Sequence, residues 1–290
     1  MDFKDLNIAE LDKNLSVPEQ EEWQAIYASY RSGSVLTGQV VGVDEHEVKY
    51  IPDGKKQAVR RKIRCLIVVP YRVKIIIPDS EAFLDFEEPP SLQSMCGSKI
   101  NFIITEIDRL EGIAIASRKQ ALEQIKRVNA RRKPSEGDII NVDVVSVGRG
   151  ACTVTYKGYD TMLTQREISH NNIYDLREVV HPGDVMKALV KEFDGESKIF
   201  RLSVKDLIPH PFDGADVRHP VGSTRIAKIV GKYRGGVYCR LFDGNTEILC
   251  SYATMEYDGD YKIGDKVEIL IRKFNYERKL IYGKILRKMF

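Results

Sequence analysis

A short segment that begins at Val237, VYCRLF, places an aromatic ring and a cation at alternate positions. Successive side chains of a β-strand point to opposite faces, so Val237, Cys239 and Leu241 would face a core while Tyr238 and Arg240 face solvent together. An exposed tyrosine ring can stack on a nucleobase, which contributes about 1–3 kcal/mol per base, and a guanidinium can neutralise a phosphate. This pattern predicts a surface that holds single-stranded nucleic acid.

The region around this segment is the most basic part of the chain. Residues 217–290 hold 15 basic and 8 acidic side chains, a net of +7. The candidate RNA-binding residues here are Lys228, Tyr233, Arg234, Tyr238, Arg240, Arg272, Lys273, Tyr276 and Arg278. The competing interpretation is an ordinary solvated strand surface, because tyrosine favours strands whatever their function.

A second basic cluster, KKQAVRRKIR (55–64), carries six cations within ten residues. Such a run repels itself unless an anion lies nearby, and RNA phosphate is one candidate for that anion. The candidate RNA-binding residues here are Lys55, Lys56, Arg60, Arg61, Lys62 and Arg64. The alternative anion is an acidic face of residues 134–216, which hold 9 basic and 14 acidic side chains, a net of −5.

The sequence lacks the signatures of catalytic and metal sites. It has no Walker loop, no Gly-x-Ser-x-Gly and no His-Glu-x-x-His. The five cysteines are odd in number and no two are spaced as Cys-x-x-Cys, which is typical of small buried side chains rather than of disulfides or zinc ligands. We therefore expect no enzyme activity, no metal and no cofactor.

No membrane or secretory segment is evident either. There is no run of about 18 apolar residues, so we expect no membrane partner. The N-terminus, MDFKDLNIAELDKNL, is acidic, whereas a secretory signal begins with basic residues and an apolar stretch. The expected location is the cytoplasm.

Glycine followed by serine or aspartate marks three repeated units. The pair opens the units at Gly33, Gly137 and Gly222 and recurs once inside each of them. After the second pair, each unit has two β-rich runs around a polar turn, which is the signal of a hairpin. Each unit therefore has about five short strands. Because so small a sheet cannot leave its edges open and still bury a core, we expect closed barrels.

Three stretches carry a family resemblance: GSVLTGQV (33–40), SRKQAL (117–122), and GDVMKALV followed by IFRLSVK (199–205). They are similar to the opening, the helical continuation and the closing hairpin of the S-one RNA-binding domain. That domain is the OB-fold repeat of bacterial ribosomal protein S-one. The resemblance implies an all-β protein of three tandem five-stranded OB-fold barrels with an N-terminal helix and a helical linker.

The repeats and the resemblance together give the expected domains. In chain order they are an N-terminal helical segment at 1–32, a first barrel at 33–117 with a charged insertion at 44–63, a linker helix at 118–134, an acidic second barrel at 135–208, a Pro-rich linker at 209–221 and a basic third barrel at 222–290. The N-terminal helix would place Trp23 against the first barrel.

The resemblance implies RNA binding, and aromatic residues indicate which barrel carries it. The family presents aromatics on its second strand. Tyr238 matches that position in unit three, whereas unit two has Arg149–Thr153 there, without an aromatic. We expect a non-catalytic binder of single-stranded RNA with little sequence preference, acting on mRNA or at the ribosome, mainly through the third barrel. The alternatives are a protein–protein scaffold of OB barrels without nucleic-acid binding, and a binder of single-stranded DNA. The acidic second barrel is the candidate contact for the ribosome or another protein.

Overall fold

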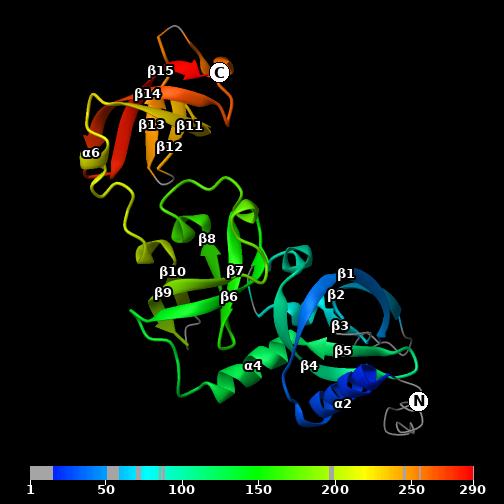
Figure 1. Ribbon diagram of the computed structural model, residues 1–290. Helices are drawn as coiled ribbons and strands as arrows, with labels where there is room; N and C mark the ends of the chain where they lie inside the picture. Colours follow the sequence, from blue (N-terminus) through cyan, green and yellow to red (C-terminus); the bar gives the residue numbers. More distant parts are fainter. Residues whose placement is uncertain are drawn as a thin grey trace. The chain divides into compact units, whose positions relative to one another are not determined.

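The computed structural model describes residues 16–50, 59–69, 73–84, 86, 89–195, 199–243, 246–254 and 256–289 (Figure 1). Strands dominate, and they form three five-stranded sheets in chain order. The predicted all-β fold with an N-terminal helix and a helical linker is confirmed. Contacts divide the chain into two compact units, Met1–Gln165 with Asp175–Val204, and Arg166–Tyr174 with Lys205–Phe290.

Helix α2 (Val17–Ser32) completes the core of the first barrel. Its start is fixed by a capping box, in which the Ser16 backbone N–H donates to Glu19 Oε2 at 2.9 Å. One face buries Trp23, Ile26 and Tyr27, which are 3%, 1% and 7% exposed, among the apolar side chains of the barrel. The helix is therefore part of this barrel rather than a free partner-binding element, as its amphipathic pattern predicts.

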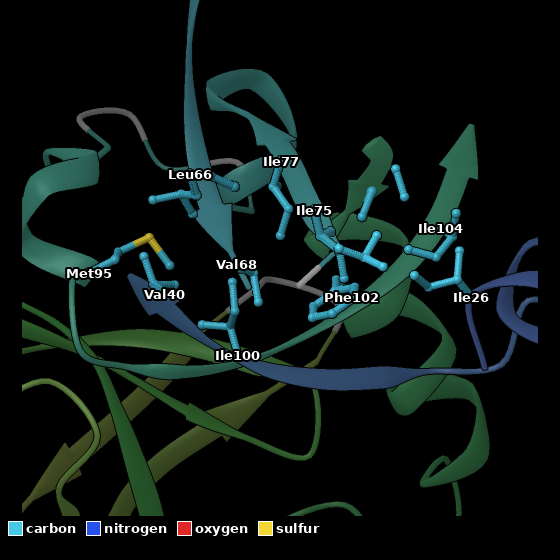
Figure 2. Close-up of a cluster of buried hydrophobic side chains, with 14 of the residues drawn as sticks. Ile26, Val40, Leu66, Val68, Ile75, Ile77, Met95, Ile100, Phe102 and Ile104 are labelled. Carbon is cyan, nitrogen blue, oxygen red and sulfur yellow. The ribbon is translucent and has the colours of Figure 1, made fainter. Parts of the chain in front are cut away.

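The first sheet is a closed barrel with the order β1-β2-β3-β5-β4. Its strands are β1 (Leu36–Tyr50), β2 (Val59–Val68), β3 (Lys74–Pro78), β4 (Lys99–Asp108) and β5 (Ile113–Ser117), with the short helices α3 (Asp79–Ala82) and η2 (Leu92–Met95) beside them. Figure 2 shows side chains from all sides of the barrel meeting in one cluster, among them Val40, Leu66 and Phe102. These three are at most 1% exposed, so the barrel interior is filled by packed side chains.

The predicted insertion between the first two strands is largely strand. Strands β1 and β2 stay paired in register from Gly42 opposite Ile67 out to Tyr50 opposite Val59. The charged stretch therefore extends the hairpin beyond the barrel as a two-stranded ribbon instead of leaving it as a loop.

Helix α4 (Arg118–Val128) follows the first barrel and contacts the second sheet within the same unit. The Ser117 hydroxyl accepts a hydrogen bond from the Gln120 N–H at 3.1 Å, as the capping-box spacing predicts. Arg118 Nη1 lies 2.7 Å from Asp160 Oδ2, and the two side chains are 1% and 0% exposed. Arg118 also donates to the Ala82 carbonyl at 3.1 Å, so a buried ion pair ties the first barrel, the helix and the second sheet together.

The second sheet has the order β10-β9-β6-β7-β8. Its strands are β6 (Ile139–Val147), β7 (Ala151–Tyr156), β8 (Tyr159–Thr164), β9 (Val185–Asp194) and β10 (Ile199–Ser203), with α5 (Gln165–Ile168) and η3 (Leu176–Glu178) between β8 and β9. The backbone ladder does not close between β8 and β10. The Thr161 hydroxyl instead donates across this gap to the Phe200 carbonyl, so the fully closed barrel expected here is an open sheet bridged by a side chain.

The third sheet is again a closed barrel, with the order β11-β12-β13-β15-β14 (Figure 1). Its strands are β11 (Thr224–Tyr233), β12 (Gly236–Leu241), β13 (Glu247–Ser251), β14 (Lys266–Asn275) and β15 (Leu280–Met289). The short helices η4 (Lys205–Leu207), α6 (Ala215–Arg218) and η5 (Asp258–Asp260) lie in the same unit. Buried apolar residues such as Ile229, Ile248 and Ile269 fill the interior, which leaves alternate side chains of every strand on the outside.

Candidate nucleic-acid interface

Strand β12 alternates as its sequence predicts. Val237, Cys239 and Leu241 are 0%, 0% and 4% exposed and lie in the barrel core. Tyr238 and Arg240 alternate with them and are only partly buried. The strand therefore presents a ring and a guanidinium on the same outer surface.

The strand register extends this surface across four strands. Tyr238 lies opposite Leu249 on β13, Leu249 opposite Tyr282 on β15, and Tyr282 opposite Lys273 on β14. Paired residues on neighbouring strands point to the same face. We call these four residues the outer row. It places two aromatic rings, one aliphatic side chain and one cation side by side.

Tyr233 supports the ring of Tyr238 from the end of β11. The two ring centroids are 5.1 Å apart, with the planes tilted by 58°. Tyr233 packs over Gly236, where an added Cβ would lie 2.7 Å from the tyrosine hydroxyl oxygen and 2.2 Å from the Cys250 carbonyl oxygen. Burial raises the pKa of Tyr233, so this ring stays neutral and serves as an apolar wall.

Arg240 has a carboxylate partner that the sequence did not reveal. Its Nη2 and Nε atoms donate to Glu247 Oε1 at 2.6 and 3.1 Å, across the β12–β13 pair. On the other side of Arg240, the exposed Lys228 is its cross-strand neighbour on β11. Much of the positive charge of Arg240 is therefore neutralised, and Lys228 is left as the exposed cation beside the Arg240–Glu247 pair.

The remaining candidates of the third barrel lie on exposed positions. Arg234 lies between β11 and β12, Arg272 on β14, and Arg278 between β14 and β15. Lys228, Arg234, Arg272, Lys273 and Arg278 are all exposed. Within the described part of the barrel, ion pairs use other cations, namely Lys232, Arg240, Lys279, Arg287 and Lys288. These five candidate cations thus remain available to an anionic ligand.

The side chain of Tyr276 is already engaged by other residues, so it is a weaker candidate for stacking on a base. Its side chain is 63% exposed, but its ring stands edge-on to Phe212 at 5.5 Å between centroids. The hydroxyl donates to Asp216 Oδ2 at 3.0 Å, and this hydrogen bond raises the pKa of Tyr276. The loop between β14 and β15 is thereby tied to the segment that precedes the barrel.

A cleft of about 380 Å³ lies over the β12–β13 surface. The barrel contributes Tyr238, Leu249, Glu247 and Arg278 to its lining. Other lining residues come from His170–Asn172 and His210–Phe212, which belong to the same compact unit. Sequence reasoning missed this second wall, because no local pattern links these segments to the barrel.

The basic cluster in the first barrel is described only in part. Lys55 and Lys56 lie outside the described residues. Arg60 and Arg61 are on β2, with side chains that are not described, whereas Lys62 and Arg64 are exposed on the same strand. Strand register places Lys62 opposite Glu47 and Arg64 opposite Glu45. The Glu45 carboxylate therefore lies beside Arg64 and offsets part of this charge, which is a third explanation beside RNA and an acidic domain.

Neither a metal site nor a membrane helix is found in the part of the chain that the structure describes. No group of three or more His, Cys, Asp or Glu side chains there is arranged to hold a metal ion. None of the helices in that part is long and apolar enough to cross a bilayer.

Comparison with known proteins identifies the type of domain. Small ribosomal subunit protein bS1 of Staphylococcus epidermidis is 30% identical over 151 residues, which are 51% of this chain and 38% of that protein. The predicted resemblance to tandem S-one domains is confirmed.

The chain is also similar to an enzyme. A 4-hydroxy-3-methylbut-2-enyl diphosphate reductase of Clostridium tetani is 26% identical over 217 residues, which are 72% of this chain and 34% of the reductase. The chain thus spans little more than a third of the length of these curated relatives. A multidomain protein with nucleic acid binding domains from Streptococcus pneumoniae aligns over 89% of the chain and 74% of its own length at 10% identity, but its TM-score of 0.20 supports no argument. No family model matches the chain.

Proposed function

We propose that this chain binds single-stranded RNA through its third barrel, without catalysing a reaction. The outer row is the observation that carries the proposal. It spans three strand spacings of about 4.8 Å each and holds Tyr238, Leu249 and Tyr282 in line, with Lys273 at one end. Bases stack on such rings, and the exposed cations around the row neutralise phosphates. Similarity to a ribosomal protein supports RNA as the polymer.

The chemistry of the row predicts little sequence preference. Ring faces and an aliphatic side chain accept any base, because stacking does not read the hydrogen-bonding edge. This property suits a protein that acts on many mRNA sequences or at the ribosome, in the cytoplasm. The second sheet carries Thr153 and Thr155 where β12 carries Tyr238 and Arg240, so we assign it a spacer or protein-docking role.

The test is fluorescence anisotropy with a labelled oligouridylate about twelve nucleotides long, within the usual site size of OB folds. Tyr238→Ala and Tyr282→Ala should each weaken binding by about 5- to 150-fold, which corresponds to 1–3 kcal/mol per stacked base. Tyr257→Ala is the control, because Tyr257 is 75% exposed and lies outside the outer row. With about four phosphate contacts, raising the salt from about 50 to 200 mM should weaken binding by roughly 50-fold.

The same titration separates the competing functions. Equal affinity for the matching oligothymidylate would make the protein a general single-strand binder, because stacking and phosphate contacts do not read the 2′-hydroxyl. Absence of binding to either strand at micromolar protein would refute the proposal. That result would leave the protein-scaffold alternative.

A further inference from the structure

A segment between β8 and β9, Asn172–Tyr174, lies against the face that is proposed to bind RNA. It belongs to the compact unit of the third barrel. The backbone N–H and the side-chain amide of Asn172 donate to Glu247 Oε2 at 3.2 and 3.4 Å. The Asn172 carbonyl accepts a hydrogen bond from Arg240 Nη2 at 3.2 Å. One residue of this segment thus binds both members of the Arg240–Glu247 pair.

Tyr174 extends the contact to the end of the outer row. Its hydroxyl oxygen lies 1.2 Å from the position that a Cβ on Gly231 would occupy. Gly231 is the cross-strand partner of Tyr238, so the Tyr174 ring lies beside Tyr238 on the same face. Burial, Glu247 and Tyr238 each raise the pKa of Tyr174, which agrees with this placement. The glycine is what makes room for the ring.

The groups that this segment presents to the face are similar in chemistry to those of a nucleotide. Tyr174 brings an aromatic ring to the stacking surface, as a base would. The backbone carbonyl of Asn172 offers Arg240 a hydrogen-bond acceptor, as a phosphate oxygen would, and the two N–H donors of Asn172 bind Glu247. Tyr174 remains 45% exposed, and the hydrogen bonds to Glu247 are 3.2 and 3.4 Å long, so displacement of the segment does not require the barrel core to open.

We infer that Asn172–Tyr174 is an internal competitor that occupies the outer face of β11–β13 until single-stranded RNA displaces it. This inference rests on the proposed function and adds its regulation. Affinity for RNA is then reduced by the fraction of molecules in which the segment is bound, and any change that releases the segment raises affinity without adding a contact.

Gly231→Ala is the sharpest test, because it removes no side chain from the RNA face. The new methyl group displaces Tyr174, while the backbone at Gly231 is one that alanine adopts. Gly259→Ala is the matched control, since a Cβ there would meet nothing within 4 Å. Tyr174→Ala releases the segment by a second route. We expect Gly231→Ala and Tyr174→Ala to bind the oligouridylate about tenfold more tightly than the wild type, and Gly259→Ala to be unchanged.

Release of the segment is checked by amide hydrogen exchange of residues 172–174, which should become faster in Gly231→Ala and also in the wild type when RNA is added. Faster exchange with unchanged or weaker RNA binding would refute the competition, and the Tyr238→Ala result would still decide the proposed function. If neither the wild type nor Gly231→Ala binds RNA, the proposed function and the competition fall together.

Discussion

The buried pair of Arg118 and Asp160 should dominate the stability of the first compact unit. The Arg118 side chain is 1% exposed, and Asp160→Ala would leave the Ala82 carbonyl as its remaining described acceptor. Its Nε atom already lacks a partner among the described atoms. Removing one partner of a buried ion pair typically costs about 3–5 kcal/mol, because a charge is left buried without compensation. For a unit of this size that corresponds to a decrease in melting temperature of about 6–20 °C.

The assay is urea unfolding followed by the fluorescence of Trp23, the single tryptophan, which lies in the core of the first barrel. Far-UV circular dichroism follows all three sheets in parallel. The control is Glu192→Ala, which breaks the pair with Arg201 at 3.0 Å, where the side chains are 45% and 73% exposed. Exposed pairs contribute at most about 1 kcal/mol, so the free energy of unfolding of Glu192→Ala should differ little from that of the wild type.

A double variant separates loss of the charge pair from loss of packing. Arg118→Met with Asp160→Leu replaces both charges by apolar side chains, and should recover most of the stability lost in Asp160→Ala. If Asp160→Ala loses less than about 1 kcal/mol, as the exposed control does, then the pair does not join the helix to the second sheet in solution. That result would refute the reasoning.

Two further predictions concern titrating side chains. At about pH 8, Cys96 should be the one thiol of five that reacts rapidly with Ellman's reagent, because the other four are buried. Burial raises the pKa of Cys65 to about 11 and of Cys152 to about 12, and a second fast thiol in the absorbance trace would contradict their burial. The pKa of His210 is lowered first by burial and then by His170, and its Nδ1 accepts a hydrogen bond from the Phe212 N–H. The unfolded state therefore binds more protons than the folded state, so the free energy of unfolding falls as pH drops below about 6.5. His210→Gln, which does not titrate, should flatten the dependence of the urea midpoint on pH, and an unchanged slope would show that His210 does not cause it.

The alternation of buried and outward side chains on β12 was predictable, because it depends only on consecutive residues of one strand. Val237 and Cys239 face the core, and Tyr238 faces out, as the pattern requires. The outer row was not predictable in the same way. Leu249 and Tyr282 join Tyr238 only through the pairing of β12 with β13 and the parallel pairing of β13 with β15. Such register depends on the closed barrel and not on any local pattern.

Partners of the predicted residues were missed for a related reason. Arg240 was expected to face a phosphate, but its cross-strand neighbour Glu247 and the distant Asn172 bind it in the structure. Tyr174 comes from a connection between strands of another sheet, and nothing near it in sequence points to Gly231. The closed second barrel was likewise expected from repetition, whereas the β8–β10 edge is bridged by one hydroxyl.

That bridged edge has a consequence for local unfolding. Backbone amides along a closed ladder exchange with solvent only when several strands separate, but the edges of β8 and β10 that face each other lack such a ladder. Opening there requires the loss of the Thr161 hydrogen bond and the separation of the side chains packed beside it, not the breaking of a row of backbone hydrogen bonds. The second sheet therefore has a built-in line of low local stability, along which it can open while the barrels with continuous ladders stay folded.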